Sequence, residues 1–537
     1  MESNKPYLLF NVPQGFEHVA LEEILEKIPE LQSVEYIIPP LYGLIYFKDC
    51  SILTVDMLIK FKSLLSIDNV FVGIAEYNVD LGERNQLPKE EKYKFIEDAL
   101  YEGNWLHALN VWHFCTEHHI DEINYESFCS AGFSEMYSLP NNNNNTNNNC
   151  IHEPKKIKVN KENKQKENDN NSLSTFEARN NYISKILECR QQNLFDLQQC
   201  NYINSEIEGY KDLTQREIAF RGTFLKYDYK SKEIRTQQLA SYLGDATFKK
   251  FMEVGGQELF KGKLKVNLKQ WDLEVWSAFI KSKNWEIGEK DKHCGIAGVH
   301  ELKEGEKMKE ENKKDTINGS VNTSTYDKYK ILYGITLPLN NYVKNDKSIN
   351  HRNRCKFGRT SLRPTVAYCI SRFSNIQPGM VVVDPCCGVG TIPIEASCLC
   401  PNAMYYGGDI DQDEINDCAL ENIKYMTKLT GKRPPIDIFI WNCKKIPFGD
   451  DSVDRIVTDL PWGFRELSYV ENRRLYPPLF REYSRIIKPS GLIILMTSQR
   501  KLVRQIMGYG WCKLDLLYFT EVVVGYTVGL YVFKKRE

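Results

Sequence analysis

The stretch TDLPWGF at residues 458–464 contains residue types that a simple turn does not require. It follows the apolar run VDRIV, so we predict that it lies at the end of a buried strand. A turn needs Pro461 and a glycine, but neither Asp459 nor Trp462. A carboxylate and a neighbouring backbone carbonyl can accept the N–H groups of an exocyclic base amine, while a flat side chain stacks on the base. We therefore predict a catalytic site in which Asp459 orients an amine, Pro461 exposes a carbonyl and Trp462 holds the ring.

Three more polar residues follow apolar runs in the same part of the chain. Asp384 ends VVVD, Asp409 ends MYYGGD and Asn442 follows IDIFIW. If these runs are parallel strands, their carboxyl ends meet at one edge, where ligands bind. An acid after the second strand is placed to hold ribose hydroxyls, and an amide after the third could read an adenine edge. Gly388 and Gly390 let the backbone approach a ligand at the start of a helix.

The predicted ligand of these strand ends is a methyl donor and not a dinucleotide. A dinucleotide fingerprint requires a small residue three positions after the second glycine, where this chain has Pro393. A donor with a sulfonium group, held by Asp384 and Asp409, could undergo in-line attack by the amine. The alternative for each strand-end residue is a cap or turn role, and for Trp462 a packing role.

Strands and helices alternate in residues 346–537, which predicts an α/β fold with a doubly wound parallel sheet. Amphipathic helical spacing runs through 413–429, and we expect an N-cap near Asp411 or Asp413. The predicted strands are 380–384, 404–409, 436–442, 455–460 and 491–497, followed by two more at 512–522 and 525–533.

The preceding residues predict mixed α+β structure in two blocks, 1–135 and 181–345. Two polar segments interrupt them. Residues 136–180 are rich in Asn and Lys and contain little to bury, so we expect a disordered insertion. The same interpretation applies to residues 301–325.

The overall composition is that of a multidomain protein of 537 residues with a net charge of -1, so a nucleic-acid site would have to be a local basic patch. The spacing of the 16 cysteines indicates neither a disulfide framework nor a zinc site, and we expect no metal. No signal peptide or membrane-spanning run is apparent. We therefore expect no membrane association and a location in the cytosol or the nucleus.

A basic segment, HRNRCKFGRTSLRP, leads into the last region and contains no acid. Such a run is usually a solvated face, but this one includes an aromatic residue and adjoins the catalytic region. We therefore predict phosphate contacts by five residues. They are Arg352, Arg354, Lys356, Arg359 and Arg363.

Three motifs together resemble the THUMP-domain RNA guanine-N2 methyltransferases. They are DPCCGVGTIPIEA, DIDQDEINDCALENI and TDLPWG. The resemblance implies a class I methyltransferase domain at 346–537, a ferredoxin-like part of the THUMP module at 1–135 and a THUMP domain at 181–345. The implied cofactor is S-adenosylmethionine. Its implied binding residues are Asp384, Cys386, Gly388, Gly390, Thr391, Asp409, Asp411, Asn442 and Cys443.

The resemblance also implies an activity and partners. The enzyme would form N2-methylguanosine in tRNA, in the acceptor stem, together with a small zinc-binding activator subunit. Two positions depart from the family pattern: Trp462 stands where Phe or Tyr is common, and Asn442-Cys443 replaces Asp-Ala.

Other functions remain open at this point. A guanine-N2 methyltransferase of another RNA, such as a spliceosomal small RNA, would use nearly the same motif. An Asp/Asn-Pro-aromatic motif also serves DNA adenine and protein glutamine N-methyltransferases. An inactive RNA-binding protein is a further possibility, although the intact strand-end acids disfavour it. A dehydrogenase is disfavoured by Pro393.

Overall fold

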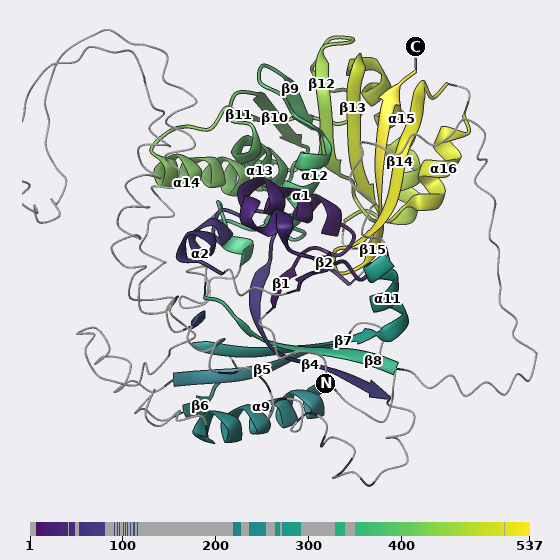
Figure 1. The fold of residues 1–537 in the computed structure, drawn as a ribbon. Coiled ribbons are helices and arrows are strands. Elements are labelled where there is room, and N and C mark those ends of the chain that lie inside the picture. The colour runs from purple at the N-terminus through teal and green to yellow at the C-terminus, as the bar shows by residue number, and fades with distance from the viewer. Residues whose placement is uncertain are drawn as a thin grey trace, which may run out of the picture.

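The structure is a computed structural model. It describes residues 7–40, 42–48, 53–80, scattered positions between 88 and 115, 218–226, 236–253, 264–268, 271–290, 328–338, 349–464, 466–509 and 511–536. The two predicted disordered segments, 136–180 and 301–325, lie outside these residues. The described strands form an eight-stranded sheet and a seven-stranded sheet. The eight-stranded sheet lies below the seven-stranded sheet in Figure 1.

The eight-stranded sheet has the order β2-β3-β1-β4-β8-β7-β5-β6. Its strands are Leu8–Asn11 (β1), Tyr36–Ile37 (β2), Leu44–Phe47 (β3), Asn69–Asp80 (β4), Ile218–Lys226 (β5), Leu264–Val266 (β6), Leu273–Lys281 (β7) and Lys328–Thr336 (β8). The long antiparallel pairing of β4 with β8 joins the two predicted blocks, 1–135 and 181–345, in one sheet and one hydrophobic core. The blocks therefore do not form separate sheets.

The helices of this region are Glu17–Lys27 (α1), Val55–Phe61 (α2), Thr236–Glu253 (α9) and Ser282–Lys290 (α11), with short 3₁₀ turns at Pro29–Ser33 and Ile349–His351. Helix α1 also packs on the second sheet's domain. Phe16 and Val19 belong to that domain's core cluster, and Arg372 pairs with Glu26 at 2.8 Å. The first region is therefore fixed against the second by apolar and ionic contacts.

The seven-stranded sheet has the order β11-β10-β9-β12-β13-β15-β14. Its strands are Val381–Asp384 (β9), Met404–Asp409 (β10), Ile436–Ile440 (β11), Val453–Asp459 (β12), Ile487–Thr497 (β13), Leu514–Val523 (β14) and Thr527–Lys535 (β15). β9 to β13 pair in parallel, whereas β15 is antiparallel to both β13 and β14. This confirms the predicted strands of the catalytic region.

Helices cover both faces of this sheet, because alternate strand residues enter different cores. Val382 and Val457 pack with α12 (Pro364–Phe373), α13 (Thr391–Leu399) and α14 (Leu420–Thr430), which a π-helical turn at Glu414–Ala419 precedes. Val383 and Ile456 pack on the other face with α15 (Tyr469–Ile486) and α16 (Arg500–Met507). The predicted doubly wound α/β architecture is therefore confirmed.

Candidate active site

Four predicted site residues lie at one edge of the seven-stranded sheet. Asp384, Asp409 and Asp459 are the last residues of β9, β10 and β12. Asn442 follows the end of β11 by two residues. Because these neighbouring strands are parallel, the four positions share the carboxyl edge, as the sequence predicts.

Asp384 is a buried carboxyl group with one oxygen that lacks a well-formed hydrogen bond. Its side chain accepts a 3.3 Å hydrogen bond from the Cys386 amide through Oδ1. Its Oδ2 is buried and accepts no well-formed hydrogen bond among the described residues, although the Thr458 hydroxyl lies close enough to lower the pKa of the group. Burial raises the pKa of Asp384 to about 8, and the nearby carboxylates of Asp409 and Asp459 contribute. Such a group would gain from a cationic or hydrogen-bond-donating ligand.

The loop after β9 fixes the Asp409 carboxylate. Gly388 and Gly390 have φ angles of 49° and 81°, which favour glycine at both positions. The Gly388 amide donates to Asp409 Oδ2 at 3.0 Å, and the Asp411 amide donates to Oδ1 at 3.1 Å. Each carboxylate oxygen retains a lone pair, so Asp409 is oriented and could still accept ligand hydroxyls.

Three other predicted cofactor residues take part in local structure. Asp411 Oδ1 accepts from the amides two and three residues further on, which confirms a cap at this position. Asn442 is exposed, and its Oδ1 accepts from the amide two residues further on at 3.0 Å. Thr391 is buried and accepts from Arg354 Nη1 at 2.5 Å. A ligand role for these side chains stays a prediction.

Cys386 and Cys443 face each other between the ends of β9 and β11. Both are half-buried free cysteines packed against the same core cluster. The interaction of the two thiols raises the pKa of Cys386 and lowers that of Cys443.

Sequence reasoning missed Trp441 and Ile410. The Trp441 indole is buried and donates to the Pro385 carbonyl at 3.1 Å. A Cβ atom at Gly408 would overlap this indole ring, so the glycine is required there. Ile410 follows Asp409 directly and is 71% exposed, so it offers an apolar surface beside the acid. The sequence signal that could have identified Ile410 was an apolar residue immediately after a strand-end acid.

The site is rich in acidic side chains. The pKa of Glu414 is raised by burial, and the carboxylates of Glu466 and Asp409 contribute. S-adenosylmethionine carries positively charged sulfonium and ammonium groups and a ribose. The buried Oδ2 of Asp384, the oriented Asp409 and the surrounding acids therefore fit this cofactor in both charge and hydrogen bonding.

Asp459 and Trp462 are directly hydrogen-bonded. The indole Nε1 of Trp462 donates to Asp459 Oδ1 at 2.8 Å. Burial raises the pKa of Asp459 to about 7, although the Trp462 bond opposes this shift. Trp462 is half-buried against the domain core. Trp462 therefore orients the acid, a role that the sequence did not predict, and its stacking on a base stays a prediction.

The predicted free carbonyl is not that of Pro461. Pro461 O accepts from Asn472 Nδ2 at 2.9 Å and from Tyr476 Oη at 2.8 Å, which occupies both lone pairs. The preceding carbonyl, of Leu460, has no hydrogen-bond donor within the part of the chain that the structure describes. Leu460 O, beside Asp459, is therefore the available acceptor, and Pro461 O anchors the loop.

The predicted phosphate contacts are wrong for Arg352 and Arg354. Arg352 is 3% exposed, pairs with Glu395 at 2.8 Å and donates to the Leu65 carbonyl at 2.7 Å. Arg354 is 2% exposed and donates to Thr391. Both guanidinium groups are used inside the protein because the segment lies against the catalytic core.

The other three basic residues are exposed. Arg363 pairs with Asp68 at 2.7 Å, so it too links the first region to the catalytic domain. Lys356 and Arg359 lie at the surface. Their contact with phosphate stays a prediction.

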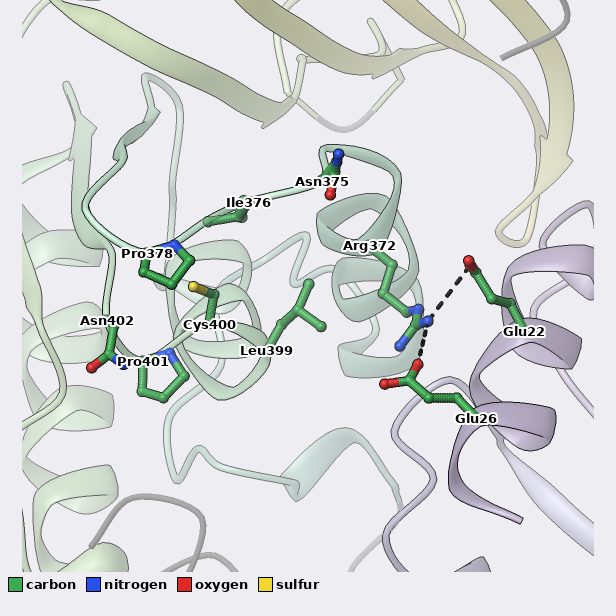
Figure 2. A pocket seen from close by; sticks show the side chains of 10 residues that line it. All are labelled: Glu22, Glu26, Arg372, Asn375, Ile376, Pro378, Leu399, Cys400, Pro401 and Asn402. Atoms are coloured by element: carbon green, nitrogen blue, oxygen red, sulfur yellow. Dashed lines mark hydrogen bonds and ion pairs between the residues drawn. The ribbon is translucent and has the colours of Figure 1, made fainter. Parts of the chain in front are cut away.

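A cavity of ≈ 380 Å³ lies elsewhere, between α1, α12 and α13. Figure 2 shows Arg372 in this cavity, facing Glu22 and Glu26 of α1. Its remaining lining residues, at 375–378 and 399–402, precede β9 and β10. The cavity is therefore at the amino edge of the sheet, opposite the strand-end acids, and marks the contact of α1 with the catalytic domain.

No group of His, Cys, Asp or Glu side chains in the described residues could hold a metal ion. None of the helices in these residues has the length and apolar character needed to cross a membrane.

The fold and the sequence together define a methyltransferase. Residues 351–513 match a family described as RMKL-like, methyltransferase domain. The chain is therefore an enzyme of the methyltransferase class, with S-adenosylmethionine as its cofactor.

Known proteins are similar to nearly the whole chain. The tRNA (guanine(6)-N(2))-methyltransferase THUMP3 of Bos taurus is 26% identical over 98% of this chain and 87% of its own length. The Homo sapiens protein of the same name is 26% identical over 97% and 86%. The crystal structure of TrmN from Thermus thermophilus has a TM-score of 0.52 at 15% identity and covers 99% of both chains. The last comparison supports the fold.

Proposed function

We propose that this enzyme methylates the exocyclic N2 of a guanosine in the acceptor stem of tRNA. The observation that carries the proposal is the Asp459 carboxylate, which is held by Trp462 through one oxygen and lies beside the Leu460 carbonyl. Two acceptors in this arrangement suit an amine with two N–H groups.

The side chains of this site would prepare the amine. Asp459 Oδ2 and Leu460 O accept its two N–H groups and orient the nitrogen lone pair. S-adenosylmethionine, when bound, supplies an electrophilic methyl group. As positive charge develops on the nitrogen, the Asp459 carboxylate stabilises it and can take the released proton, because its pKa is about 7.

The relatives favour tRNA over other RNA substrates. Similarity to the proteins named for tRNA guanine(6) extends over 98% of this chain. Similarity to the Bos taurus U6 snRNA (guanine-N(2))-methyltransferase THUMPD2 is 30% but covers 26% of this chain. We therefore propose a guanosine near the start of the acceptor stem as the methylated nucleotide.

We assign supporting roles to other parts of the chain. The region of the eight-stranded sheet would be a THUMP module that binds tRNA, and Lys356 and Arg359 would contact phosphate. A small zinc-binding activator subunit would associate with the catalytic domain. Edge strand β11 offers this subunit an exposed apolar surface, since Phe439 is 46% and Ile440 50% exposed. The enzyme would act in the cytosol or the nucleus.

The test is methyl transfer from labelled S-adenosylmethionine to purified tRNA, followed by digestion to nucleosides. Wild type and Asp459→Ala are compared with and without the activator subunit. We expect N2-methylguanosine from the wild type and a loss of at least about 100-fold in the variant. Binding of S-adenosylmethionine by both proteins serves as the folding control.

Labelling of a different RNA alone would retain the chemistry and reject tRNA. RNA binding without labelling of any RNA, even with the activator subunit, would favour an inactive RNA-binding protein. Labelling by Asp459→Ala at the wild-type rate would reject the proposed role of this carboxylate.

A further inference from the structure

Two exposed aromatic rings lie next to the candidate active site. Phe464 is 63% exposed and Tyr526 is 51% exposed. Their ring centroids are 5.2 Å apart and the rings are nearly parallel, with an angle of 29°. Burying large apolar rings stabilises a protein, and these two rings are left in water. An exposed stacked pair beside a catalytic residue therefore indicates a binding surface.

This Phe464–Tyr526 pair is continuous with the catalytic residues. Phe464 follows the TDLPWG motif, and its neighbour Gly463 has a φ of 82°. Tyr526 lies in the turn between β14 and β15. Its ring contacts Trp462 edge to face at 6.4 Å and 86°. The order in space is therefore Asp459, Trp462, Tyr526 and Phe464.

The sheet topology brings the two turns together. β15 is antiparallel to β13, and Gly529 pairs with Thr497 at the end of β13. The start of β15 thus lies at the same edge as the end of β12. In Figure 1 the C-terminus, at the far end of β15, points away from the eight-stranded sheet, so the Tyr526 turn lies on the side that faces this sheet.

The loop that carries Phe464 is anchored by several bonds. The Trp462 carbonyl accepts from Ser498 Oγ at 2.7 Å and also from Gln499 Nε2. Leu467 has a φ of 52°, an unfavourable angle for a branched side chain that surrounding contacts must hold. The backbone that leads into Phe464 is therefore anchored to the residues that follow β13.

A cationic segment lies against the same loop. The hydroxyl of Thr360 is hydrogen-bonded to Glu466, which places the exposed Arg359 beside the loop. A positive group next to stacked aromatic rings is the combination by which proteins bind the backbone and bases of unpaired nucleic acid. On the other side, Gln14 bridges to Val523 at the end of β14, so the first region of the chain adjoins the Tyr526 turn.

We propose that the Phe464–Tyr526 pair stacks on an unpaired nucleobase of the RNA that lies next to the target guanosine. Trp462 is half-buried and is already predicted to stack on the target base, so we do not assign it to this second base. The inference rests on the proposed RNA substrate and adds a base-binding subsite to it. A base in this subsite would hold the strand open beside the guanosine that is methylated.

The experiment uses the full chain and two probes, total tRNA and a single-stranded oligouridylate of twelve nucleotides. Binding of both is measured by fluorescence anisotropy, and kcat and KM are measured for tRNA and S-adenosylmethionine. Two double variants are compared with the wild type. The leucine double variant, Phe464→Leu with Tyr526→Leu, keeps apolar bulk but removes both rings. The ring-preserving double variant, Phe464→Tyr with Tyr526→Phe, keeps both rings.

The matched control is Tyr509→Ala, another exposed ring, stacked on Trp511 at 5.7 Å. Trp511 lies against Arg481 of α15. Arg481 is 13 residues, or ~20 Å along the helix, from the N-cap Ser468, which is close to Phe464 in the chain. The control ring is therefore far from the proposed subsite.

We expect the leucine double variant to bind oligouridylate about 10-fold more weakly, since base stacking has this magnitude. The KM for tRNA should rise by a similar factor, while the KM for S-adenosylmethionine is unchanged. The ring-preserving double variant and Tyr509→Ala should behave as wild type.

Unchanged RNA affinity in the leucine variant would overturn the proposal, as would a loss of S-adenosylmethionine binding, which would indicate a structural role. If the wild type fails to methylate tRNA, the proposed function fails. The oligouridylate comparison then still decides whether the pair binds bases.

Discussion

Asp459 combines two properties that suit an acceptor of amine protons. Burial raises its pKa to about 7, and the Trp462 indole holds one of its oxygens at 2.8 Å. Its reactive form is the carboxylate, so activity should fall as the pH drops through this pKa. The hydrogen bond from Trp462 favours the charged form and therefore keeps the pKa lower than burial alone would.

Trp462→Phe keeps an aromatic ring and removes this hydrogen bond. The pKa of Asp459 should rise by about one unit, because a hydrogen bond to a charged group contributes about 1.5–3 kcal/mol. The acidic limb of kcat/KM should move to higher pH by the same amount, with partial recovery at alkaline pH. The measurement is a pH profile with tRNA, and Trp511→Phe is the control. An unshifted limb would show that the indole does not tune Asp459.

Asp384→Asn tests the second buried carboxyl. The pKa of Asp384 is raised to about 8 in the folded protein, whereas its value in the unfolded chain is near 4. Between about pH 4 and pH 8 the folded protein therefore binds this proton and the unfolded chain does not. The free energy of unfolding consequently falls as the pH rises through this range. Asparagine cannot ionise. We expect the cofactor-free variant to melt about 2–4 °C higher than wild type at pH 8 and to bind S-adenosylmethionine at least 10-fold more weakly. Equal melting temperatures at pH 8 would contradict the assigned pKa.

At the scale of elements, the motif loop takes its shape from α15 and the end of β13. Asn472 and Tyr476 lie one turn apart on α15 and both donate to Pro461 O. Ser468 and Glu471 form a capping box that fixes where this helix begins. The carboxyl group and the free carbonyl are thus positioned by a helix that carries no reacting group itself.

Asn472→Ala and Tyr476→Phe each remove one donor from Pro461 O. We expect each to cost about 1 kcal/mol of unfolding free energy and to lower kcat by about 10-fold, since small displacements of reacting groups are costly. Binding of S-adenosylmethionine should change little. Tyr469→Phe is the control on the same helix, because Tyr469 is 48% exposed and is not one of the two donors to Pro461 O. A kcat loss in the control equal to that in Tyr476→Phe would refute the anchoring role.

At the scale of the molecule, buried charges join the first region to the catalytic domain. Arg352 pairs with Glu395 of α13 and reaches the Leu65 carbonyl of the first region. Asp68 of the first region binds Arg363 and Thr365. These contacts set the position of the proposed RNA-binding region relative to the strand-end acids.

Arg352→Met leaves the buried Glu395 without its ion-pair partner, although Asn353 still donates to it. We expect a loss of about 3–5 kcal/mol in unfolding free energy. The salt dependence of tRNA binding should be unchanged, because Arg352 does not reach phosphate. The exposed pair of Lys424 with Glu421 provides the control, and Lys424→Ala should cost less than about 1 kcal/mol. A reduced salt slope in Arg352→Met would restore the phosphate interpretation.

The catalytic sheet and the place of its acids could be predicted from the sequence alone. Strand ends are local events, since an apolar β-branched run stops at a polar residue, and alternation with helices makes the strands parallel. Asp384, Asp409 and Asp459 could therefore be assigned to one edge without knowledge of any long-range contact.

The contacts of each polar group, in contrast, depend on long-range packing and could not be predicted. A run of arginines reads as a solvated face, because sequence does not reveal that Glu395 and Leu65 O lie beside Arg352. The pairing of β4 with β8 and the stacking of Phe464 on Tyr526 join segments far apart in the chain, which no local periodicity encodes. The two donors to Pro461 O come from a later helix, so only the folded chain shows that Leu460 offers the free carbonyl.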